Sequence, residues 1–177
     1  MDKLAKKNPR KIIDLLSERL TFERSGVKLY DTLLSRLRLV RDPVLEPLLE
    51  KLERFRDEEK EHEEWLEEQI RALGGDPSAV TEQAILVQTE SEGIERVVRR
   101  DQNVPHDFHA LLIAELADNA GWDLLVEIAD ELGDSKAKRQ FRKRLREEEE
   151  HLLFVRKTLL DLTSKEVSEP APAAPAE

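Results

Sequence analysis

Apolar residues recur every three or four positions over four long stretches of the chain, the spacing of an amphipathic α-helix. Asparagine or aspartate followed by proline precedes several of these stretches, and Gly74-Gly75 and Gly133 follow two of them, which are typical start and stop signals. Four long helices are therefore predicted over about residues 9–40, 43–73, 106–132 and 135–162, and a shorter one over about 77–100. The shorter helix is expected to use Ile85, Ile94 and Val97 as its apolar positions.

The spacing between the helices predicts how they connect. Tight turns join the first long helix to the second and the third to the fourth, so each pair is expected to form an antiparallel hairpin. The segment 75–105 is too long for a turn, and at about 1.5 Å per helical residue it can run most of the length of a bundle. The sequence thus predicts an all-α domain over residues 1–163 with a long, partly helical crossover. The remaining segment 164–177, "SKEVSEPAPAAPAE", is expected to be a disordered Pro/Ala-rich tail.

Composition supports a helical bundle and excludes several kinds of site. Charged residues make up 38% of the 177 residues and aromatic residues 5%, and the net charge of -10 would repel nucleic acid. The chain has no cysteine, so disulfides, thiolate-bound metals, iron–sulfur clusters and thiol nucleophiles are excluded. No continuous apolar run resembles a signal peptide or a membrane span, so a cytoplasmic protein without a membrane partner is expected.

Each of the four apolar stripes is interrupted near its middle by a glutamate, and in two of them a histidine follows three residues later on the same face. Any single Glu-x-x-His match is weak, because "RDEEKEHEEWLEEQ" and "REEEEH" are so rich in glutamate that a solvated face would also produce one. The inward set is Glu23, Glu59, His62, Glu115, Glu148 and His151. The glutamates expected to face solvent are Glu58, Glu61, Glu63, Glu64, Glu147, Glu149 and Glu150.

The numbering provides a geometric test of this set. In an antiparallel hairpin, residues equidistant from the turn lie at the same level. Glu23 and Glu59 are equidistant from Arg41, at the expected turn, and Glu115 and Glu148 are equidistant from the turn at residues 132–134. Both pairs therefore lie near the middle of the bundle, about 25 Å from their turns. The crossover can then bring all six side chains to one place.

Four ionised carboxylates in an apolar core would be costly without counter-charges. Two divalent cations would balance them, and two neutral imidazoles would complete the ligand set without adding charge. Oxygen and imidazole ligands without thiolate suit iron or manganese. One glutamate or one Glu-x-x-His element from each helix is the ligand pattern of di-iron and di-manganese carboxylate bundles.

Other residues near the predicted centre have two interpretations each. Tyr30 lies two turns after Glu23 on the same face and is either a redox-active phenol or a core tyrosine with its hydroxyl satisfied. Asp118, one turn after Glu115, is an additional carboxylate ligand or an outer neighbour of the ligands. Two groups are expected to play no part as ligands: the packing residues Trp65 and Trp122, and the exposed or capping residues His106 and His109.

These residues resemble those of the ferritin-like superfamily, near the rubrerythrin and bacterioferritin di-iron proteins. The resemblance covers about residues 9–163 and rests on the crossover, Glu23, "EKEH" at 59–62, Glu115 and "EEEH" at 148–151. It implies a ferritin-like four-helix bundle holding two iron ions. It also implies that Glu59 and Glu148 bridge the irons, that Glu23 and Glu115 are terminal ligands, and that each histidine ligates one iron. A tyrosine at the position of Tyr30 is typical of the family's metal pocket.

The resemblance implies an oxidoreductase in which Fe(II) reacts with O₂ or peroxide, as in ferroxidases and peroxidases. No rubredoxin-type module is present, so an external electron donor would be needed. A Pro/Ala tail replaces a fifth helix, which leaves a homodimer and a higher homo-oligomer both open. Three alternatives also stand: a dimanganese or mixed-metal redox enzyme on the same ligands, a substrate oxidase, and a non-catalytic helical interaction protein whose polar centre fixes helix register.

Overall fold

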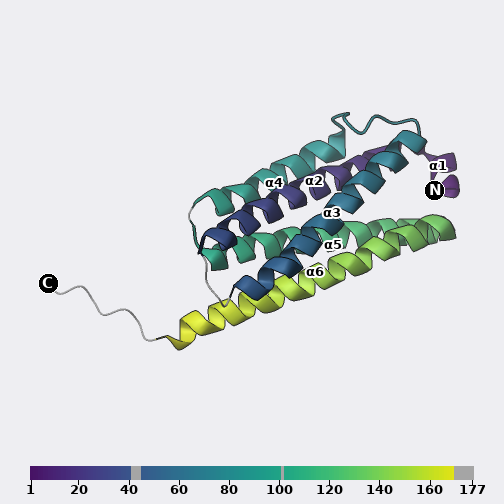
Figure 1. The fold of residues 1–177 in the computed structure, drawn as a ribbon. Helices are drawn as coiled ribbons and strands as arrows, with labels where there is room; N and C mark the ends of the chain where they lie inside the picture. The colour runs from purple at the N-terminus through teal and green to yellow at the C-terminus, as the bar shows by residue number, and fades with distance from the viewer. Residues whose placement is uncertain (41–44, 101, 170–177) are drawn as a thin grey trace.

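The computed structural model describes residues 1–40, 45–100 and 102–169. Within these residues six helices form and no strand does (Figure 1). The helices are α1 (Asp2–Lys7), α2 (Pro9–Val40), α3 (Glu46–Ala72), α4 (Glu82–Arg100), α5 (Val104–Glu131) and α6 (Ser135–Ser168). None of them combines the length and the apolar character that a membrane crossing would require.

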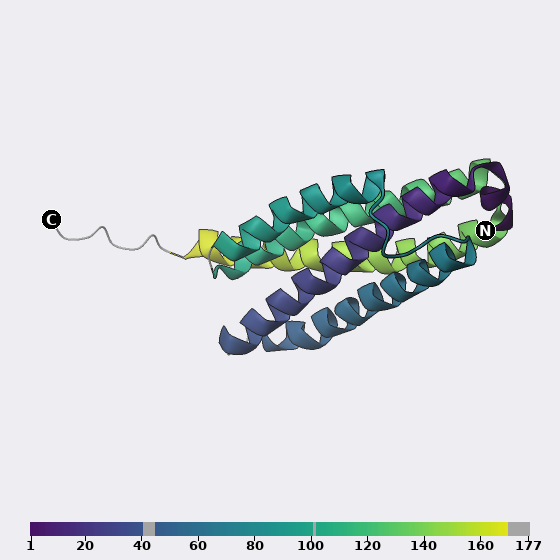
Figure 2. The same cartoon turned by 90° about the horizontal axis from the view of Figure 1, so that it is seen from above.

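The four long helices form the predicted pair of antiparallel hairpins, α2 with α3 and α5 with α6. Figure 2 shows that the two hairpins cross at an angle. Helix α4 belongs to the crossover between them and packs on the outside of the bundle against α2 and α5. The fold is therefore the predicted all-α bundle with a long, partly helical crossover.

Local sequence signals account for most helix ends. Asn8, Asn103 and Asp134 each accept a hydrogen bond from the backbone N–H three residues later, which satisfies a donor at the start of α2, α5 and α6. Gly74 and Gly133 follow α3 and α5 with φ values of 80° and 66°, in the left-handed region that glycine adopts at low cost. The expected start signal Asp42-Pro43 lies outside the described residues.

The crossover helix differs from its prediction in its start and in its buried face. It begins at Glu82 and not near residue 77, because Asp76 forms a turn with Ser78 and Ala79, and the Thr81 hydroxyl caps the helix at Ala84. Ile85 and Val97 were expected to be apolar contacts but are 51% and 38% exposed. As an outer helix resting on two neighbours, α4 buries only a narrow strip, formed by Ala84, Val87, Ser91 and Val98, with Ile94 partly buried.

Two further differences concern the chain ends. Helix α6 continues to Ser168, beyond the expected end near residue 162, and stops at Glu169, whose extended backbone is the conformation favoured before a proline. Most of the expected tail, residues 170–177, lies outside the described residues. Helix α1 was not predicted, because a six-residue helix is unstable alone and depends on tertiary contacts.

The hydrophobic core consists of two clusters, one on each side of the middle of the bundle. One lies toward the α2–α3 connection and includes Leu34, Phe55 and Phe108, among others. The other lies toward α1 and includes Leu16, Ile70 and Trp122, among others, together with Leu4 of α1. The space between the clusters is occupied by buried polar side chains.

Asp134 joins the N-terminal helix α1 to the start of α6. One carboxylate oxygen caps α6 through the Ala137 N–H, and the other accepts from the N–H groups of Lys3 and Leu4. Burial raises the pKa of Asp134, but these three hydrogen bonds outweigh it and hold the pKa below the ordinary value of 3.8. The carboxylate therefore stabilises the fold at neutral pH, and its contribution is lost as the pH falls through the folded-state pKa.

We expect Asp134→Ala to lower the free energy of unfolding by about 1–2 kcal/mol at neutral pH, because the cap of α6 and the anchor of α1 are lost together. Asp134→Asn keeps a capping oxygen and should retain most of the stability. Urea unfolding at pH 7 measures both. Equal stability of Asp134→Ala and the unmodified chain would contradict this account of how α1 is held.

Candidate metal centre

The structure brings the six inward-facing side chains of the sequence pattern into one cluster in the middle of the bundle. All six are no more than 2% exposed. Two groups drawn only from these six side chains have their potential ligand atoms within 4.8 Å of one another, and Glu148 belongs to both. The groups are Glu59, Glu115, Glu148 and His151, and Glu23, His62 and Glu148.

Glu148 lies between the two imidazoles. Its Oε1 is 2.8 Å from His62 Nδ1 and its Oε2 is 3.2 Å from His151 Nδ1. A second glutamate is near each imidazole: Glu23 Oε2 is 3.3 Å from His62 Nδ1, and Glu59 Oε1 is 3.3 Å from His151 Nδ1. The cluster is thus two overlapping sites, one around each imidazole, that have Glu148 in common.

Several atoms that face the centre have no hydrogen-bond partner among the described residues, although buried polar groups in proteins are nearly always paired. Every one of the six side chains contributes at least one. They are Glu23 Oε2, Glu59 Oε2, His62 Nδ1, Glu115 Oε2, both oxygens of Glu148 and His151 Nδ1. Converging lone pairs of this kind are the donor set of a cation site. The residues present therefore fit a pair of metal ions.

The outer nitrogen of each histidine contacts a glutamate of the facing helix. His62 Nε2 is 3.0 Å from Glu147 Oε2, and His151 Nε2 is 2.9 Å from Glu58 Oε2. Because a carboxylate accepts, each Nε2 donates. Although burial alone would lower the pKa of both imidazoles, the surrounding glutamates raise it, and once Nδ1 gives up its proton, as metal binding would require, its lone pair faces the centre. The prediction that Glu58 and Glu147 face solvent is therefore wrong. Both are only partly exposed, and the signal that identifies them is their position, one residue before the inward glutamate of each Glu-x-x-His element.

Two buried aromatic side chains orient the remaining glutamates. Trp122 Nε1 donates to Glu23 Oε1 at 2.8 Å, and the Tyr30 hydroxyl donates to Glu115 Oε1. Trp122 was expected only to pack, so its hydrogen bond adds a role that the pattern did not reveal. Each donor occupies one oxygen and leaves the other directed at the centre.

Asp118 also lies at the centre, paired with an arginine that the sequence reasoning missed. Its carboxylate comes within the same 4.8 Å limit of Glu23, Glu59 and Glu148. Arg19, 2% exposed, donates to both the carboxylate and the backbone carbonyl of Asp118. Arg19 therefore gives Asp118 a buried counter-charge, which it shares with the partly exposed Glu18.

Two glycines make the room that these side chains need. A Cβ at Gly121 would lie 2.1 Å from Cζ of Arg19, and one at Gly26 would lie 2.4 Å from Oε2 of Glu59. Both distances are far below van der Waals contact. Any larger residue at these positions would displace the guanidinium that neutralises Asp118 or a carboxylate of the centre.

The carboxyl groups of the centre differ in the direction in which their pKa is shifted. Burial raises the pKa of Glu115 to about 8, with the charge of Glu148 adding to the effect and that of His151 opposing it. Burial and the neighbouring glutamates likewise raise the pKa of Glu59. Burial acts in the same direction on Glu148, but His151 and His62 outweigh it and lower that pKa to about 2. Glu148, shared by both sites, is therefore the ionised centre of the cluster.

The other two histidines, His106 and His109, and the second tryptophan, Trp65, are not part of the centre. His106 and His109 are exposed near the start of α5, as predicted. Trp65 packs against Trp122 and Phe141, and the guanidinium of Arg144 stacks on its ring, 3.6 Å from the centroid.

The fold matches a solved structure and the sequence matches a family model. The solved structure of a ferritin-like, diiron-carboxylate protein from Bacillus anthracis superposes with a TM-score of 0.67 and 19% sequence identity, covering 86% of this chain and 98% of that one. This similarity confirms the predicted ferritin-like fold. No curated protein gives a significant match. The family model described as Rubrerythrin matches residues 14–159, which is most of the chain and contains all six residues of the cluster. The chain therefore belongs to the rubrerythrin family.

Proposed function

We propose that this protein is a non-haem di-iron oxidoreductase that binds Fe(II) and reacts with O₂ or peroxide. The observation that carries the proposal is the convergence of unpartnered, buried carboxylate and imidazole atoms from six side chains. Membership of the rubrerythrin family and the diiron-carboxylate relative of the same fold support iron as the metal.

The overlap of the atom groups suggests how two ions would be held. His62 and Glu23 would bind one iron, and His151 and Glu115 the other. Glu148 would bridge them, since its two oxygens face the two imidazoles. Glu59 would be the second bridge, because it is grouped with Glu115 and His151 and also with Glu23.

Charge balance supports two divalent ions. Arg19 offsets Asp118, so Asp118 is proposed to be an outer neighbour of the ligands. Metal binding would require Glu59 and Glu115, whose pKa values are raised, to lose their protons, and the four ionised glutamates would then match the charge of two divalent cations. Carboxylate and imidazole ligands without sulfur suit iron and also manganese, so the choice of metal needs a direct test.

The bound irons would supply the electrons for reduction of O₂ or peroxide, and the protein would control the surroundings. Glu58 and Glu147 would keep the histidine Nδ1 atoms directed inward. Tyr30, fully buried with its hydroxyl on Glu115, could deliver a proton and an electron next to the metals. The apolar clusters on both sides exclude bulk water.

Anaerobic titration with Fe(II) tests the centre directly. We expect two irons per chain and, after oxygen is admitted, a ferric oxo absorption in the near ultraviolet. Glu148→Gln should abolish stable binding of at least one iron, because the shared carboxylate is lost while its shape is kept. Glu149→Gln, which removes the same charge at the exposed neighbouring position, is the matched control and should keep both irons.

The same titration with Mn(II) distinguishes a dimanganese centre. Failure of the unmodified chain to bind either metal would leave a metal-free interaction protein as the better explanation. Unchanged iron stoichiometry in Glu148→Gln would show that the ligand assignment is wrong.

Glu58→Gln tests the outer support of His151. We expect iron affinity at one site to fall by about 10–100-fold, because a neutral amide orients the imidazole less strongly than a carboxylate does. Glu61→Gln changes the same charge on an exposed position of α3 and should leave the affinity unchanged. Competition with a colorimetric chelator measures both affinities, and equal values would exclude a positioning role for Glu58.

Tyr30→Phe separates a redox role of the phenol from a packing role. The ring remains in place, so two irons should still bind. If the hydroxyl takes part, oxidation of the bound iron should slow by about tenfold, which corresponds to about 1.4 kcal/mol of lost transition-state stabilisation. Stopped-flow absorption after mixing with O₂ or peroxide measures the rate for each oxidant. An unchanged rate with both oxidants would restrict Tyr30 to packing.

A further inference from the structure

Helix α5 lies between α4 and α6 (Figure 1), and its outward side is apolar. Between residues 110 and 122, no exposed position of α5 holds a charged or polar side chain. The exposed residues there are Ile113, Leu116, Ala117 and Ala120, and Leu124 follows on the same side one turn later. Ile113, Leu116 and Leu124 are 44%, 49% and 54% exposed. Together these five residues form the α5 face.

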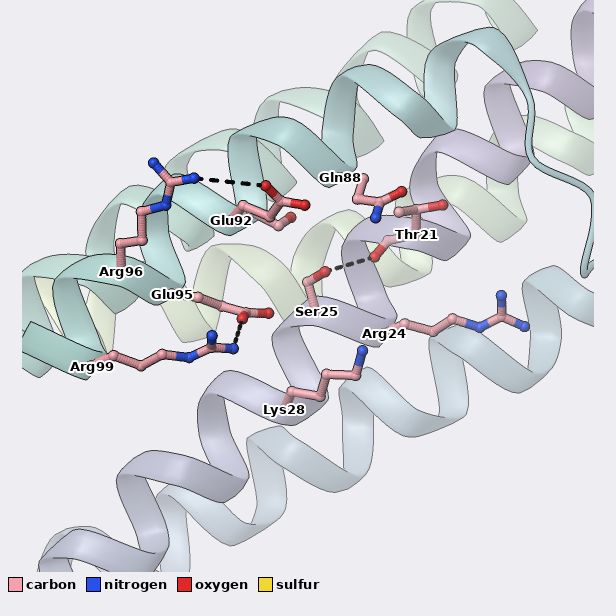
Figure 3. Close-up of a pocket in the computed structure, with 10 residues that line it drawn as sticks. Thr21, Arg24, Ser25, Lys28, Gln88, Glu92, Glu95, Arg96 and Arg99 are labelled. Atoms are coloured by element: carbon pink, nitrogen blue, oxygen red, sulfur yellow. Dashed lines mark hydrogen bonds and ion pairs between the residues drawn. The ribbon is translucent and has the colours of Figure 1, made fainter.

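Other exposed surfaces of the bundle are charged. Every exposed position of α3 between residues 50 and 68 is charged, namely Glu50, Arg54, Asp57, Lys60, Glu61, Glu64 and Glu68. Figure 3 shows charged side chains from both α2 and α4 lining the cleft between those helices. An uncharged face is therefore exceptional in a chain in which 38% of the residues are charged. A contiguous exposed apolar patch of this kind marks an interaction site.

The neighbouring helices extend the α5 face. Leu153 of α6, which is 66% exposed, lies level with Ile113, because the two residues are equidistant from Gly133 at the α5–α6 turn. Leu86 and Val97 are exposed on the side of α4 opposite the cleft. The apolar surface thus includes parts of three helices, which is the scale of a protein interface and not of a small-molecule site.

The charges at the ends of the α5 face indicate that the partner is a second copy of this chain. Exposed His109 lies at one end, and exposed Asp123 and Glu127 lie at the other. Two copies in antiparallel orientation would bring the acidic end of each against the histidine end of the other, whereas a parallel pair would place the acidic ends together. The antiparallel contact has a two-fold axis across α5 between Ala117 and Ala120, as in the self-complementary interfaces of most homodimers.

Two charged residues of α6 lie beside the α5 face. Glu147 and Glu150 contact α3, so they mark the side of α6 that faces that helix. Arg146 and Glu149 each precede one of them by one residue, which places them about 100° further round α6, on the side that continues the α5 face. Both are exposed, and neither side chain forms an ion pair or a hydrogen bond with another described residue. Their charges are therefore available to a partner.

These two charges fit the same two-fold axis. Glu149 lies level with Ala117, and Arg146 lies level with Ala120, because each pair is equidistant from Gly133. The axis exchanges the two levels, so Glu149 of each copy meets Arg146 of the other copy. Opposite charges therefore meet at two symmetric places, and this match favours a second copy over an unrelated partner.

We propose that two copies of this chain form an antiparallel two-fold dimer through the α5 face. Ile113 of each copy packs on Leu124 of the other, since the axis exchanges these positions too, and the small side chains of Ala117 and Ala120 let the two helices approach closely. The proposal involves no metal ligand and does not depend on the proposed function. The interface lies on the outer side of the helix that carries Glu115, so the dimer would hold α5 in place on both sides.

Sedimentation velocity of the full chain over a range of concentrations tests for the dimer. We expect a monomer–dimer equilibrium that Ile113→Glu weakens by at least about 100-fold, because the added charge would be buried against the apolar partner surface. Val80→Glu adds the same charge at an exposed apolar position outside the α5 face and should associate as the unmodified chain does. Circular dichroism checks that both variants keep their helices. A monomer at every concentration, or equal association of Ile113→Glu and the unmodified chain, would overturn the proposal.

Disulfide crosslinking determines the orientation, since the chain has no cysteine of its own. Chains carrying Ile113→Cys are mixed with chains carrying Leu124→Cys and oxidised. The antiparallel dimer should give mainly crosslinks between the two kinds of chain. Crosslinks mainly between chains of the same kind would indicate a parallel pair and would contradict the proposed axis.

A charge exchange on α6 tests the position of the axis. Glu149→Arg alone should weaken association by about tenfold, because it brings like charges together at two places. Adding Arg146→Glu to the same chain should restore association, since the opposite charges then meet again. A double variant that associates no better than Glu149→Arg would show that these residues do not meet across the axis.

Discussion

Burial of carboxylates at the middle of a helical bundle is the constraint on which the rest of this structure depends. Glu23, Glu59, Glu115 and Glu148 are withdrawn from water where each charge would be costly alone. The protein meets this cost partly with its own groups: the two imidazoles lie against Glu148, and Trp122 and Tyr30 each donate to one glutamate. The atoms that remain unpartnered define the space for the proposed metal ions.

The two hairpins contribute corresponding sets of side chains to the centre. Tyr30 and Trp122 each lie seven residues after the glutamate of their own helix, and each donates to the glutamate of the other helix. The histidines follow the same rule, since His62 of α3 contacts α6 and His151 of α6 contacts α3. These four hydrogen bonds therefore all cross between the hairpins, and they form only when the hairpins dock in one register.

The two halves differ at one informative place. Gly26 and Asp118 occupy equivalent positions, three residues after Glu23 and Glu115. The glycine admits the carboxylate of Glu59, whereas the aspartate adds a charge that requires Arg19, and Arg19 in turn requires the space above Gly121. The presence of Asp118 at the position equivalent to Gly26 thus explains why Arg19 is buried in the otherwise apolar stripe of α2. It also makes the surroundings of the two proposed irons unequal.

The sequence by itself determined the four long helices, the hairpin pairing and the six inward side chains, because helical periodicity and distance from a turn are local properties of the chain. Whether those six side chains are metal ligands stays a prediction. Only the tertiary structure decided the partners of Glu58, Glu147, Trp122 and Arg19, since each contact joins residues at least 85 positions apart. The same holds for α1 and for the face that α4 buries. Short and outer helices take their stability from neighbours, which periodicity alone does not specify.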